Sequence, residues 1–261
     1  MAQQAKMASL GTLSAGVGHE IGNVLNNIRG MVQSFRLWQK LGSWTNFSLE
    51  DKEKAFYEIV EGVDANVLRA QEIMNRLNAL AKNPEELKPE PIDFNKSVEA
   101  GVWFTEKDLE WVHITLTKEL APNLPKALAN EGVIEQTMMN LVTNAKDAIQ
   151  MKGNLSEKKI TVRTLQWEDK IAVEVSDNGI GIPPENLDKI FEPFFTTKDV
   201  TRNADKNTVK GTGLGLFVVK MLVEHCGGEI SVESEKGKGA TFYIKFPIAP
   251  KGIEHAPSAR E

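Results

Sequence analysis

The first eighty residues carry two runs of apolar side chains with the spacing of an α-helix, and this pattern constrains the fold more than any other feature. The first run comprises Leu10, Leu13, Val17, Ile21, Val24, Ile28, Met31, Phe35 and Trp38. A polar break, LGSWTNFS at 41–48, precedes a second run of Phe56, Val60, Val63, Val67, Ala70, Met74, Leu77 and Leu80. Steps of three and four residues line one face of a helix, so the chain should begin with an antiparallel helical hairpin.

Each apolar stripe is too wide for two helices to bury both stripes completely. A second copy of the chain would complete the burial by forming a four-helix bundle, so we predict a homodimer. Ser48 is placed to cap the second helix, because acidic residues follow it in the first turn at positions 50, 51 and 53.

A proline-rich segment separates the hairpin from a region of different character. The stretch NPEELKPEP, Asn83 to Pro91, contains three prolines and should end the second helix. Beyond it, stretches with the period of strands mix with stretches with the period of helices, which indicates a two-layer α/β sandwich and an α+β chain overall. The expected divisions are 1–83 for the hairpin, 84–91 for a linker, 92–248 for the sandwich and 249–261 for a disordered tail.

Length and composition narrow the classes of function. A chain of 261 residues can hold two ordinary domains, and its net charge of −5 gives no sign of a surface for nucleic acid. Cys226 is the single cysteine, which excludes an intramolecular disulfide and fits a reducing compartment. No run has the length of a membrane span and no signal peptide is evident. We therefore expect a cytoplasmic chain, which could also be the cytoplasmic part of a longer, membrane-bound protein.

Two glycine-rich turns mark a candidate phosphate site. DNGIGIP at 177–183 follows an apolar strand, and GTGLGL at 211–216 opens a helix, so both can bring backbone N–H groups close to phosphates. Asp177 could accept a hydrogen bond from the exocyclic amine of a base. Either turn alone is weak evidence, and an aspartate at a strand end is as compatible with an ordinary turn.

Polar residues between and before these turns could complete the site. On the helix expected over 132–151, Asn140 and Asn144 share a face, and an uncharged amide oxygen suits a magnesium ion that keeps most of its waters. Lys198, Arg202 and Lys210 could contact phosphates. Taken singly, these side chains are equally compatible with capping amides and solvated surface charges.

The ordered set NLVTNAKDA, DNGIGI, FEPFFTTK and GTGLGL closely resembles the ATP-binding domain of sensor histidine kinases, over about Glu90 to Pro247. That domain has the Bergerat fold and is related to gyrase, mismatch-repair and heat-shock chaperone ATPases. The resemblance implies ATP and Mg²⁺ as cofactors, with Asn144 as the metal ligand and Asp177 reading adenine. The nucleotide-binding residues it implies are Asn140, Asn144, Asp147, Asp177, Gly179, Gly181, Ile182, Phe195, Lys198, Gly211, Thr212, Gly213, Leu214, Gly215 and Leu216. The insertion at 199–210 departs from the shortest family versions and puts the roles of Arg202 and Lys210 in doubt.

The first helix carries a second family feature. HEIGN, His19 to Asn23, looks like the phospho-acceptor box of the histidine-kinase dimerisation domain. At 100° per residue His19 and Asn23 lie about 40° apart on the face opposite the apolar stripe, which agrees independently. The resemblance implies that His19 attacks the γ-phosphoryl group, that Glu20 accepts the imidazole proton, and that an aspartate of a response-regulator receiver domain then receives the phosphoryl group. Glu20 and Asn23 also fit the family pattern for dephosphorylating the partner, which leaves a phosphatase activity open.

Two readings from other classes stay open beside the kinase. One is a nucleotide-gated dimeric scaffold without kinase activity, and the other is an ATPase clamp of the chaperone or gyrase type. The glycines at 16, 18 and 22 around His19 also need an explanation, because an interior glycine costs a helix about 1 kcal/mol. We predict that they provide access to His19 and bending, with the helix locally unwound at 17–21, where the apolar spacing slips. The alternative is that a well-packed bundle tolerates these weak positions.

Overall fold

The computed structural model describes residues 2–40, 47–81, 87–153, 155–198, 211 and 213–250. The chain divides into two compact units, Met1–Ala81 and Lys82–Glu261. In the part of the chain that is described, no helix is both long and apolar enough to cross a bilayer.

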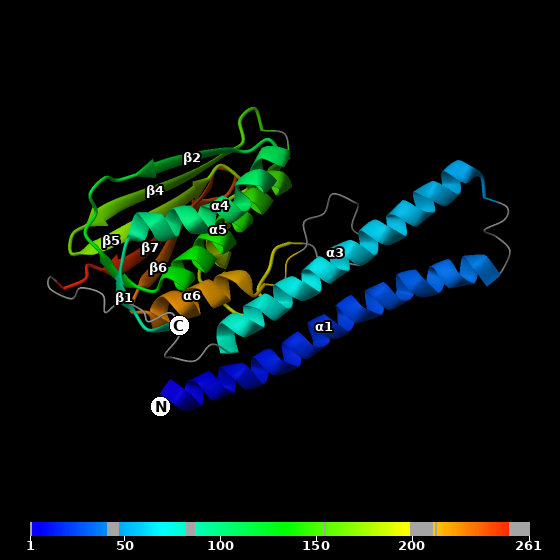
Figure 1. The fold of residues 1–261 in the computed structure, drawn as a ribbon, viewed down its shortest axis with the longest axis horizontal. Coiled ribbons are helices and arrows are strands. Elements are labelled where there is room, and N and C mark those ends of the chain that lie inside the picture. The colour runs from blue at the N-terminus through cyan, green and yellow to red at the C-terminus, as the bar shows by residue number, and fades with distance from the viewer. Residues whose placement is uncertain are drawn as a thin grey trace, which may run out of the picture. The chain divides into compact units, whose positions relative to one another are not determined.

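The first unit consists of two long helices that pack against each other, α1 (Ala2–Lys40) and α3 (Leu49–Ala81) (Figure 1). Asn27 Nδ2 donates to Asn66 Oδ1 across the pair at 3.5 Å. A Cβ added to Gly62 would lie 2.7 Å from the methyl carbon of Met31, so glycine allows this close approach. The Ser48 cap is confirmed, because Ser48 Oγ accepts the Asp51 N–H at 3.1 Å.

Helix α1 is continuous through the glycines around His19. The predicted local unwinding at 17–21 is therefore wrong. The slip in the apolar spacing changes which side chains share a face, but it leaves the backbone hydrogen bonds of a 39-residue helix intact. The connection at 41–46 lies outside the described residues.

The described residues of the second unit form a five-stranded sheet, a separate pair of short strands, and three helices. Its elements are β1 (Glu90–Ile92), α4 (Phe94–Trp111), β2 (Thr115–Leu120), β3 (Ala127–Ala129), α5 (Glu131–Lys152), β4 (Lys159–Trp167), β5 (Lys170–Asp177), α6 (Gly215–His225), β6 (Glu229–Glu235) and β7 (Gly239–Pro247), with a 3₁₀ turn at Pro184–Asn186. The sheet order is β2-β4-β5-β7-β6, with β2 and β4 parallel and the other pairs antiparallel, while β1 pairs with β3. Helices α4, α5 and α6 lie on one face of the sheet (Figure 1), which confirms the two-layer α+β arrangement.

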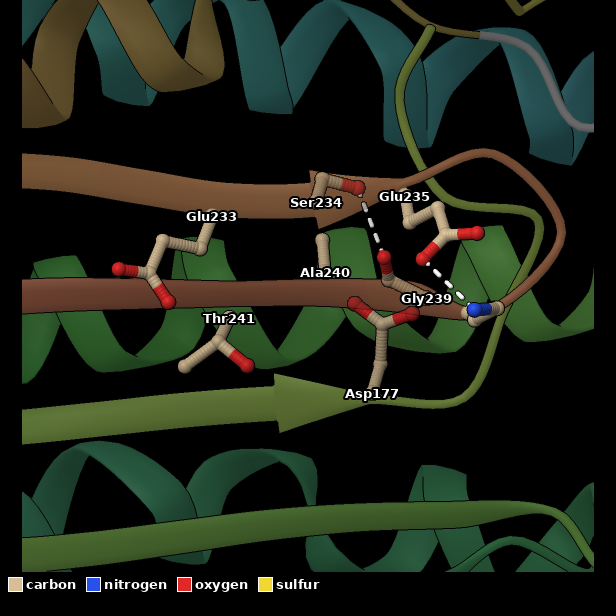
Figure 2. Close-up of a pocket in the computed structure, with 8 residues that line it drawn as sticks. Asp177, Glu233, Ser234, Glu235, Gly239, Ala240 and Thr241 are labelled. Carbon is tan, nitrogen blue, oxygen red and sulfur yellow. Dashed lines mark hydrogen bonds and ion pairs between the residues drawn. The ribbon is translucent and has the colours of Figure 1, made fainter.

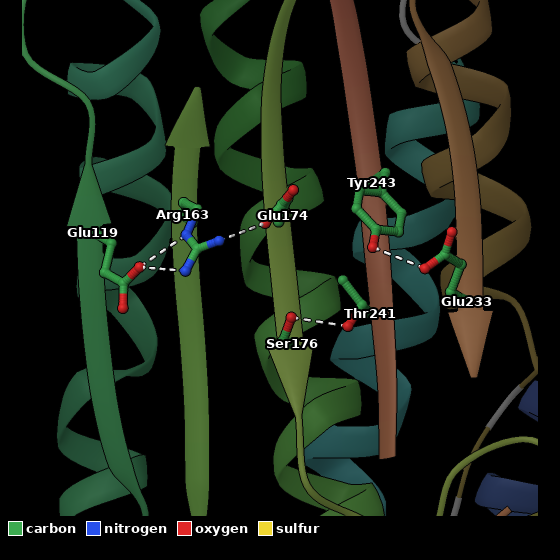
Figure 3. A network of polar contacts seen from close by, with 7 residues as sticks. All are labelled: Glu119, Arg163, Glu174, Ser176, Glu233, Thr241 and Tyr243. Carbon is green, nitrogen blue, oxygen red and sulfur yellow. Dashed lines mark hydrogen bonds and ion pairs between the residues drawn. The ribbon is translucent and has the colours of Figure 1, made fainter. Parts of the chain in front are cut away.

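The two faces of the sheet have opposite character. On the helix-covered side, Val173 and Val175 of β5 are 1% exposed and form part of the core, where the rings of Phe94 and Phe246 also lie 6.2 Å apart. The other face is polar (Figure 3): Arg163 bridges Glu119 at 2.7 Å and Glu174 at 3.7 Å. Further along this face, the hydroxyls of Ser176 and Thr241 lie 2.9 Å apart, and Tyr243 donates to Glu233 at 3.1 Å. Because side chains alternate along a strand, Asp177 at the end of β5 shares the face of Val173 and Val175.

The C-terminal boundary differs from the prediction. Ala249, where a disordered tail was expected to start, is buried, and its N–H donates to Lys126 O at 2.8 Å. The preceding residue, Ile248, forms a β-bridge with Ala127. Ala249 therefore belongs to the folded unit, because its backbone is paired with the segment that leads into β3. Residues 251–261 lie outside the described residues.

Candidate functional site

Helix α5 is the element on which the DNGIGI turn is built. A Cβ on Gly179 would lie 2.6 Å from the backbone carbonyl carbon of Ala148, and the Ile180 N–H donates to Ala148 O at 3.1 Å. Lys152, one turn further along α5, donates to Asn178 O at 2.8 Å. Glycine at 179 is required because any side chain would collide with the helix backbone. The turn is thereby fixed against the C-terminal half of α5.

Asn178 holds the other side of the same turn, a role that the sequence motifs did not reveal. Its Oδ1 accepts the Lys159 N–H at 3.0 Å, and its Nδ2 donates to Glu157 O at 2.7 Å. These two bonds tie the turn to the segment that enters β4. The sequence signal available was the asparagine within DNG itself, an amide that can bond to the backbone in both directions.

Asp177 is a partly desolvated carboxylate with fixed geometry. Its Oδ1 accepts the Gly179 N–H at 2.8 Å. Burial raises the pKa of Asp177 to about 6, although the N–H groups of Gly179 and Ala240 and the charge of Lys152 oppose that rise. The carboxylate is therefore mostly ionised at pH 7. It can accept a hydrogen bond from an amine. Leaving this partly buried carboxylate without a hydrogen-bond donor would cost free energy.

A hollow of about 370 Å³ opens beside Asp177 at the end of the sheet (Figure 2). Its walls come from Asp177, Glu233, Ser234, Glu235, Lys238, Gly239, Ala240 and Thr241. Ser234 Oγ organises this end, since it accepts the Ile182 N–H at 2.8 Å and donates to Gly239 O at 2.7 Å. Gly181 packs here as well, because its φ is +66° and a Cβ would lie 2.1 Å from Glu235 O.

The hollow reaches one end of the predicted site. Asp177 lines it, whereas Asn140, Asn144 and Lys198 do not. Two carboxylates in its wall, Glu233 and Glu235, would repel phosphates. Glu233 and Thr241 belong to the face of the sheet that no described helix covers, so the hollow marks the end of the sheet beside Asp177 and does not by itself define a pocket for a nucleotide.

A second cluster on α5 brings together residues that are far apart in the sequence. Lys198 Nζ donates to Asp147 Oδ2 at 2.5 Å and to Asn144 Oδ1 at 3.1 Å. The Lys198 N–H donates to Thr196 Oγ1 at 3.1 Å, and a Cβ on Gly211 would lie 2.7 Å from the Lys198 Cδ. The cluster thus joins FEPFFTTK, the start of GTGLGL and α5. Asn140 is not part of it, because its Nδ2 donates to Gln136 O at 2.9 Å within α5.

The start of α6 adds a turn with a close backbone contact. Gly213 has φ of +67°, and a Cβ there would lie 2.4 Å from the carbonyl carbon of Phe194, whose own φ is +66°. Leu214 is 1% exposed and precedes the helix, but it offers no side-chain acceptor for the first turn. The amino end of α6 is consequently suited to an anion. Gly215 is buried at this start, while Phe195 and Leu216 are half-buried.

Several predicted residues lie beyond what the structure describes. Thr212, Arg202 and Lys210 are outside the described residues, and the side chains of His19 and Glu20 are too, although both positions are in α1. Asn23 in the same helix is exposed, as its place opposite the apolar stripe predicts.

The α5 cluster fits a magnesium ion that arrives with phosphates. In the described part of the chain, no three His, Cys, Asp or Glu side chains gather as a metal site. Magnesium at phosphates needs only one or two protein oxygens, because it keeps several waters. Asn144 Oδ1 can supply one such oxygen, and Asp147 Oδ2 lies beside it, since both already accept hydrogen bonds from the Lys198 ammonium group.

Known proteins are similar in sequence to both units of the chain. Residues 129–250 match the family of histidine kinase-, DNA gyrase B- and HSP90-like ATPases. The chain is 35% identical over 271 residues to the sensor kinase CckA of Brucella abortus, covering 99% of this chain and 26% of that protein. It is 31% identical over 248 residues to the sensor histidine kinase ZraS of Escherichia coli, covering 95% of this chain and 48% of ZraS.

A solved structure matches the fold of this chain over most of its length. The crystal structure of the histidine kinase ThkA in complex with the response regulator protein TrrA matches with a TM-score of 0.66 at 22% identity, over 96% of this chain and 65% of that one. The chain spans about a quarter and about half the length of the two curated relatives. The match of residues 129–250 to the ATPase family, and the alignment of relatives named sensor kinases along 99% and 95% of the chain, show that the chain is similar to sensor histidine kinases across both units.

Proposed function

We propose that this chain is a homodimeric, ATP-dependent histidine autokinase that phosphorylates His19 and passes the phosphoryl group to an aspartate of a response-regulator receiver domain. The observation that carries the proposal is the extent of the alignment to sensor kinases, 99% and 95% of the chain, which includes α1 with His19 as well as the ATPase region. An ATPase clamp would not need the first unit. Because the reaction consumes ATP, we place this part of the protein in the cytoplasm.

Different residues of the second unit would bind the adenine, the phosphates and the magnesium ion of the nucleotide. Ionised Asp177 would accept a hydrogen bond from the amine of adenine. The N–H groups at the start of α6 face the phosphates, and Lys198 lies close enough to α5 to join them. Asn144 would hold Mg²⁺, which when bound neutralises phosphate charge and aligns the transferred group.

In the first unit, His19 would act as the nucleophile and Glu20 as its base. A neutral imidazole attacks through Nε2, the new N–P bond forms, and the bond between the γ-phosphorus and the bridging oxygen breaks to leave ADP. Glu20 holds the tautomer with the proton on Nδ1 and accepts that proton as charge develops on the ring. Positioning of the two groups supplies most of the acceleration.

Exposed side chains of α3 support the proposed dimer. Phe56, Val60, Val67 and Met74 are spaced by four, seven and seven residues and remain 51%, 46%, 41% and 49% exposed. Leu25 and Val32 of α1 are also exposed and seven residues apart. Heptad-spaced apolar side chains left uncovered by their own chain favour burial against a second copy in a four-helix bundle.

The His19→Gln variant tests the nucleophile. With γ-labelled ATP, the wild type should gain acid-labile, base-stable phosphate, and His19→Gln should lose at least about a thousandfold of that labelling. His225→Gln is the matched control, because His225 is exposed at the end of α6 and should leave labelling unchanged. Labelling retained in His19→Gln would contradict the assignment.

The two other readings predict different results for the wild type. Steady release of phosphate without any labelled histidine would favour the ATPase clamp. Binding of ATP without labelling, whether within a protomer or across a dimer, would favour the scaffold. Transfer from labelled protein to a receiver domain, lost when its acceptor aspartate is replaced by asparagine, tests the second step.

A further inference from the structure

The ammonium group of Lys198 occupies a position defined by two oxygens of one rigid helix. Asn144 and Asp147 are three residues apart on α5, and their Oδ1 and Oδ2 atoms lie 3.1 Å and 2.5 Å from the same nitrogen. Since both oxygens are anchored on α5, the helix and not the lysine fixes where a cation can sit. Lys198 reaches it from the FEPFFTTK segment, with its stem against Gly211.

This pair differs from the ion pairs on the surface of the same unit. The side chains of Lys198 and Asp147 are 19% and 14% exposed, whereas those of Arg163 and Glu119 are 52% and 44% exposed. A partly buried charge pair is screened less by solvent, and each partner would be costly to leave alone. The carboxylate of Asp147 therefore needs a cation beside it both before and after a nucleotide binds.

We propose that Asp147 is a positioning residue for the magnesium ion of the bound nucleotide, and that the Lys198 ammonium holds the same position when no nucleotide is present. The inference rests on the proposed ATP site. Asn144 would be the direct ligand, and Asp147 would accept a hydrogen bond from a water on the metal. Outer partners of this kind orient the ligands of a metal and commonly contribute tenfold to a hundredfold in affinity. Lys198 would transfer its bonds from Asp147 to the phosphates.

The arrangement also gives Asp147 a role in specificity. A nucleotide without metal would bring its phosphate charge against the Asp147 carboxylate, and that repulsion is strong at a partly buried site. A nucleotide with Mg²⁺ would instead satisfy the carboxylate. Asp147 should therefore make binding depend on the metal, beyond the contribution of Asn144.

The test compares nucleotide affinity of the full chain with and without magnesium. The dissociation constant of a non-hydrolysable ATP analogue is measured by calorimetry in excess Mg²⁺ and in EDTA, and the ratio of the two is the readout. In Asp147→Asn the analogue should bind more tightly in EDTA and more weakly with Mg²⁺, so the ratio should fall about tenfold or more. Asp147→Glu keeps the charge and should keep most of the ratio. It also guards against a folding defect of the asparagine variant.

Asp108→Asn is the matched control. Asp108 on α4 pairs with Lys146 at 3.6 Å and its side chain is 69% exposed, so the same change in charge is made at an exposed site on a different helix. Its ratio should equal that of the wild type. An unchanged ratio in Asp147→Asn, or an equal fall in Asp147→Asn and Asp147→Glu, would overturn the inference. Failure of the wild type to bind the analogue under either condition would instead overturn the proposed ATP site.

Manganese alone tests the part played by Lys198. In the wild type the ammonium should keep Mn²⁺ out of the cluster, and Lys198→Met should free the two oxygens. Uptake of free Mn²⁺, followed by its paramagnetic resonance signal, should therefore be greater in Lys198→Met than in the wild type. The Lys198→Met, Asp147→Asn double variant should lose that gain. Equal uptake by the wild type and Lys198→Met would show that the lysine does not hold the cation position.

Discussion

The two units differ in how completely a single copy of the chain buries its apolar side chains. In the second unit Ile171, Val173 and Ile244 are at most 1% exposed beneath the helices. In the first unit Phe56 and Val60 remain about half exposed. A domain that closes its own core can fold and bind a ligand alone, while a helix pair with an open apolar stripe is completed by association. The units therefore call for different tests, one of folding and one of assembly.

Glycines show the same contrast. A Cβ on Gly101 of α4 would lie 2.6 Å from Glu135 O of α5, so glycine there permits two helices of the second unit to approach closely. Among the described residues, a Cβ on Gly22 or Gly30 of α1 would meet nothing within 4 Å. The described packing therefore explains Gly101 but does not explain Gly22 or Gly30.

The largest effect should come from placing charges on the open stripe of α3. Val60→Glu combined with Val67→Glu would put four carboxylates into the proposed seam of a dimer without touching the core of the second unit. Burial of unpaired charge is strongly unfavourable, so the dissociation constant of the dimer should rise by about a thousandfold or more. Sedimentation equilibrium over a range of concentrations measures it, and ATP-analogue affinity should stay unchanged.

Trp111→Glu is the control for that experiment. Trp111 is 86% exposed on α4, so it too replaces an exposed apolar side chain by a charge, but in the self-contained unit. It should leave the association state as it is. If the double variant of α3 assembled as tightly as the wild type, the open stripe would not be the seam.

A smaller effect should follow from removing the buried charge of Asp177. Because its pKa of about 6 in the folded protein exceeds the ordinary value, the ionised form carries a penalty that is present above pH 6 and is lost as the pH falls through 6 toward 4. Asp177→Asn should therefore raise the free energy of unfolding at pH 7 by up to about 3 kcal/mol, and the gain should vanish near pH 4. Denaturant titrations without nucleotide at both pH values measure this difference.

The same substitution, Asp177→Asn, should abolish nucleotide binding. The variant would then be more stable than the wild type but would not bind the nucleotide. Wild-type affinity for adenosine should also weaken below pH 6, because a protonated Asp177 accepts hydrogen bonds poorly. Asp108→Asn provides the baseline in both measurements, since Asp108 is exposed. A variant that lost stability at pH 7 would mean that hydrogen bonds to the carboxylate outweigh the cost of its burial.

Sequence reasoning succeeded where a pattern is local and long. The helices α1, α3 and α5 extend over many periods, so apolar spacing located α3 and α5 to within a few residues and α1 from Leu10 onward. Strand β3 was missed because Ala127–Ala129 is too short to show alternation. The motifs placed Asp177 at a strand end and Asn144 on a helix. These positions follow from the neighbouring residues and need no knowledge of the rest of the chain.

The contacts that give the site its chemistry were not available from local patterns. Lys198 and Asp147 are 51 residues apart, and only the folded sheet and helices bring them together. The hydrogen bonds that Asn178 and Lys152 make at the DNG turn likewise depend on the position of α5 relative to β5. The change in apolar spacing at 17–21 also led to the wrong prediction of an unwound helix. Apolar spacing indicates which side chains share a face, but it says little about backbone hydrogen bonds.

The smallest effect concerns the glycines of α1. Gly22→Ala and Gly30→Ala each introduce a methyl group that contacts none of the described residues, so each should stabilise the first unit by about 0.5 to 1 kcal/mol. The two variants differ in their distance from His19 along α1, three residues against eleven. If Gly22 gives the ATP-binding unit access to His19, Gly22→Ala should slow labelling of His19 severalfold while Gly30→Ala does not. Equal stabilisation with unchanged labelling in both would leave Gly22 as a weak position that the packed helices simply tolerate.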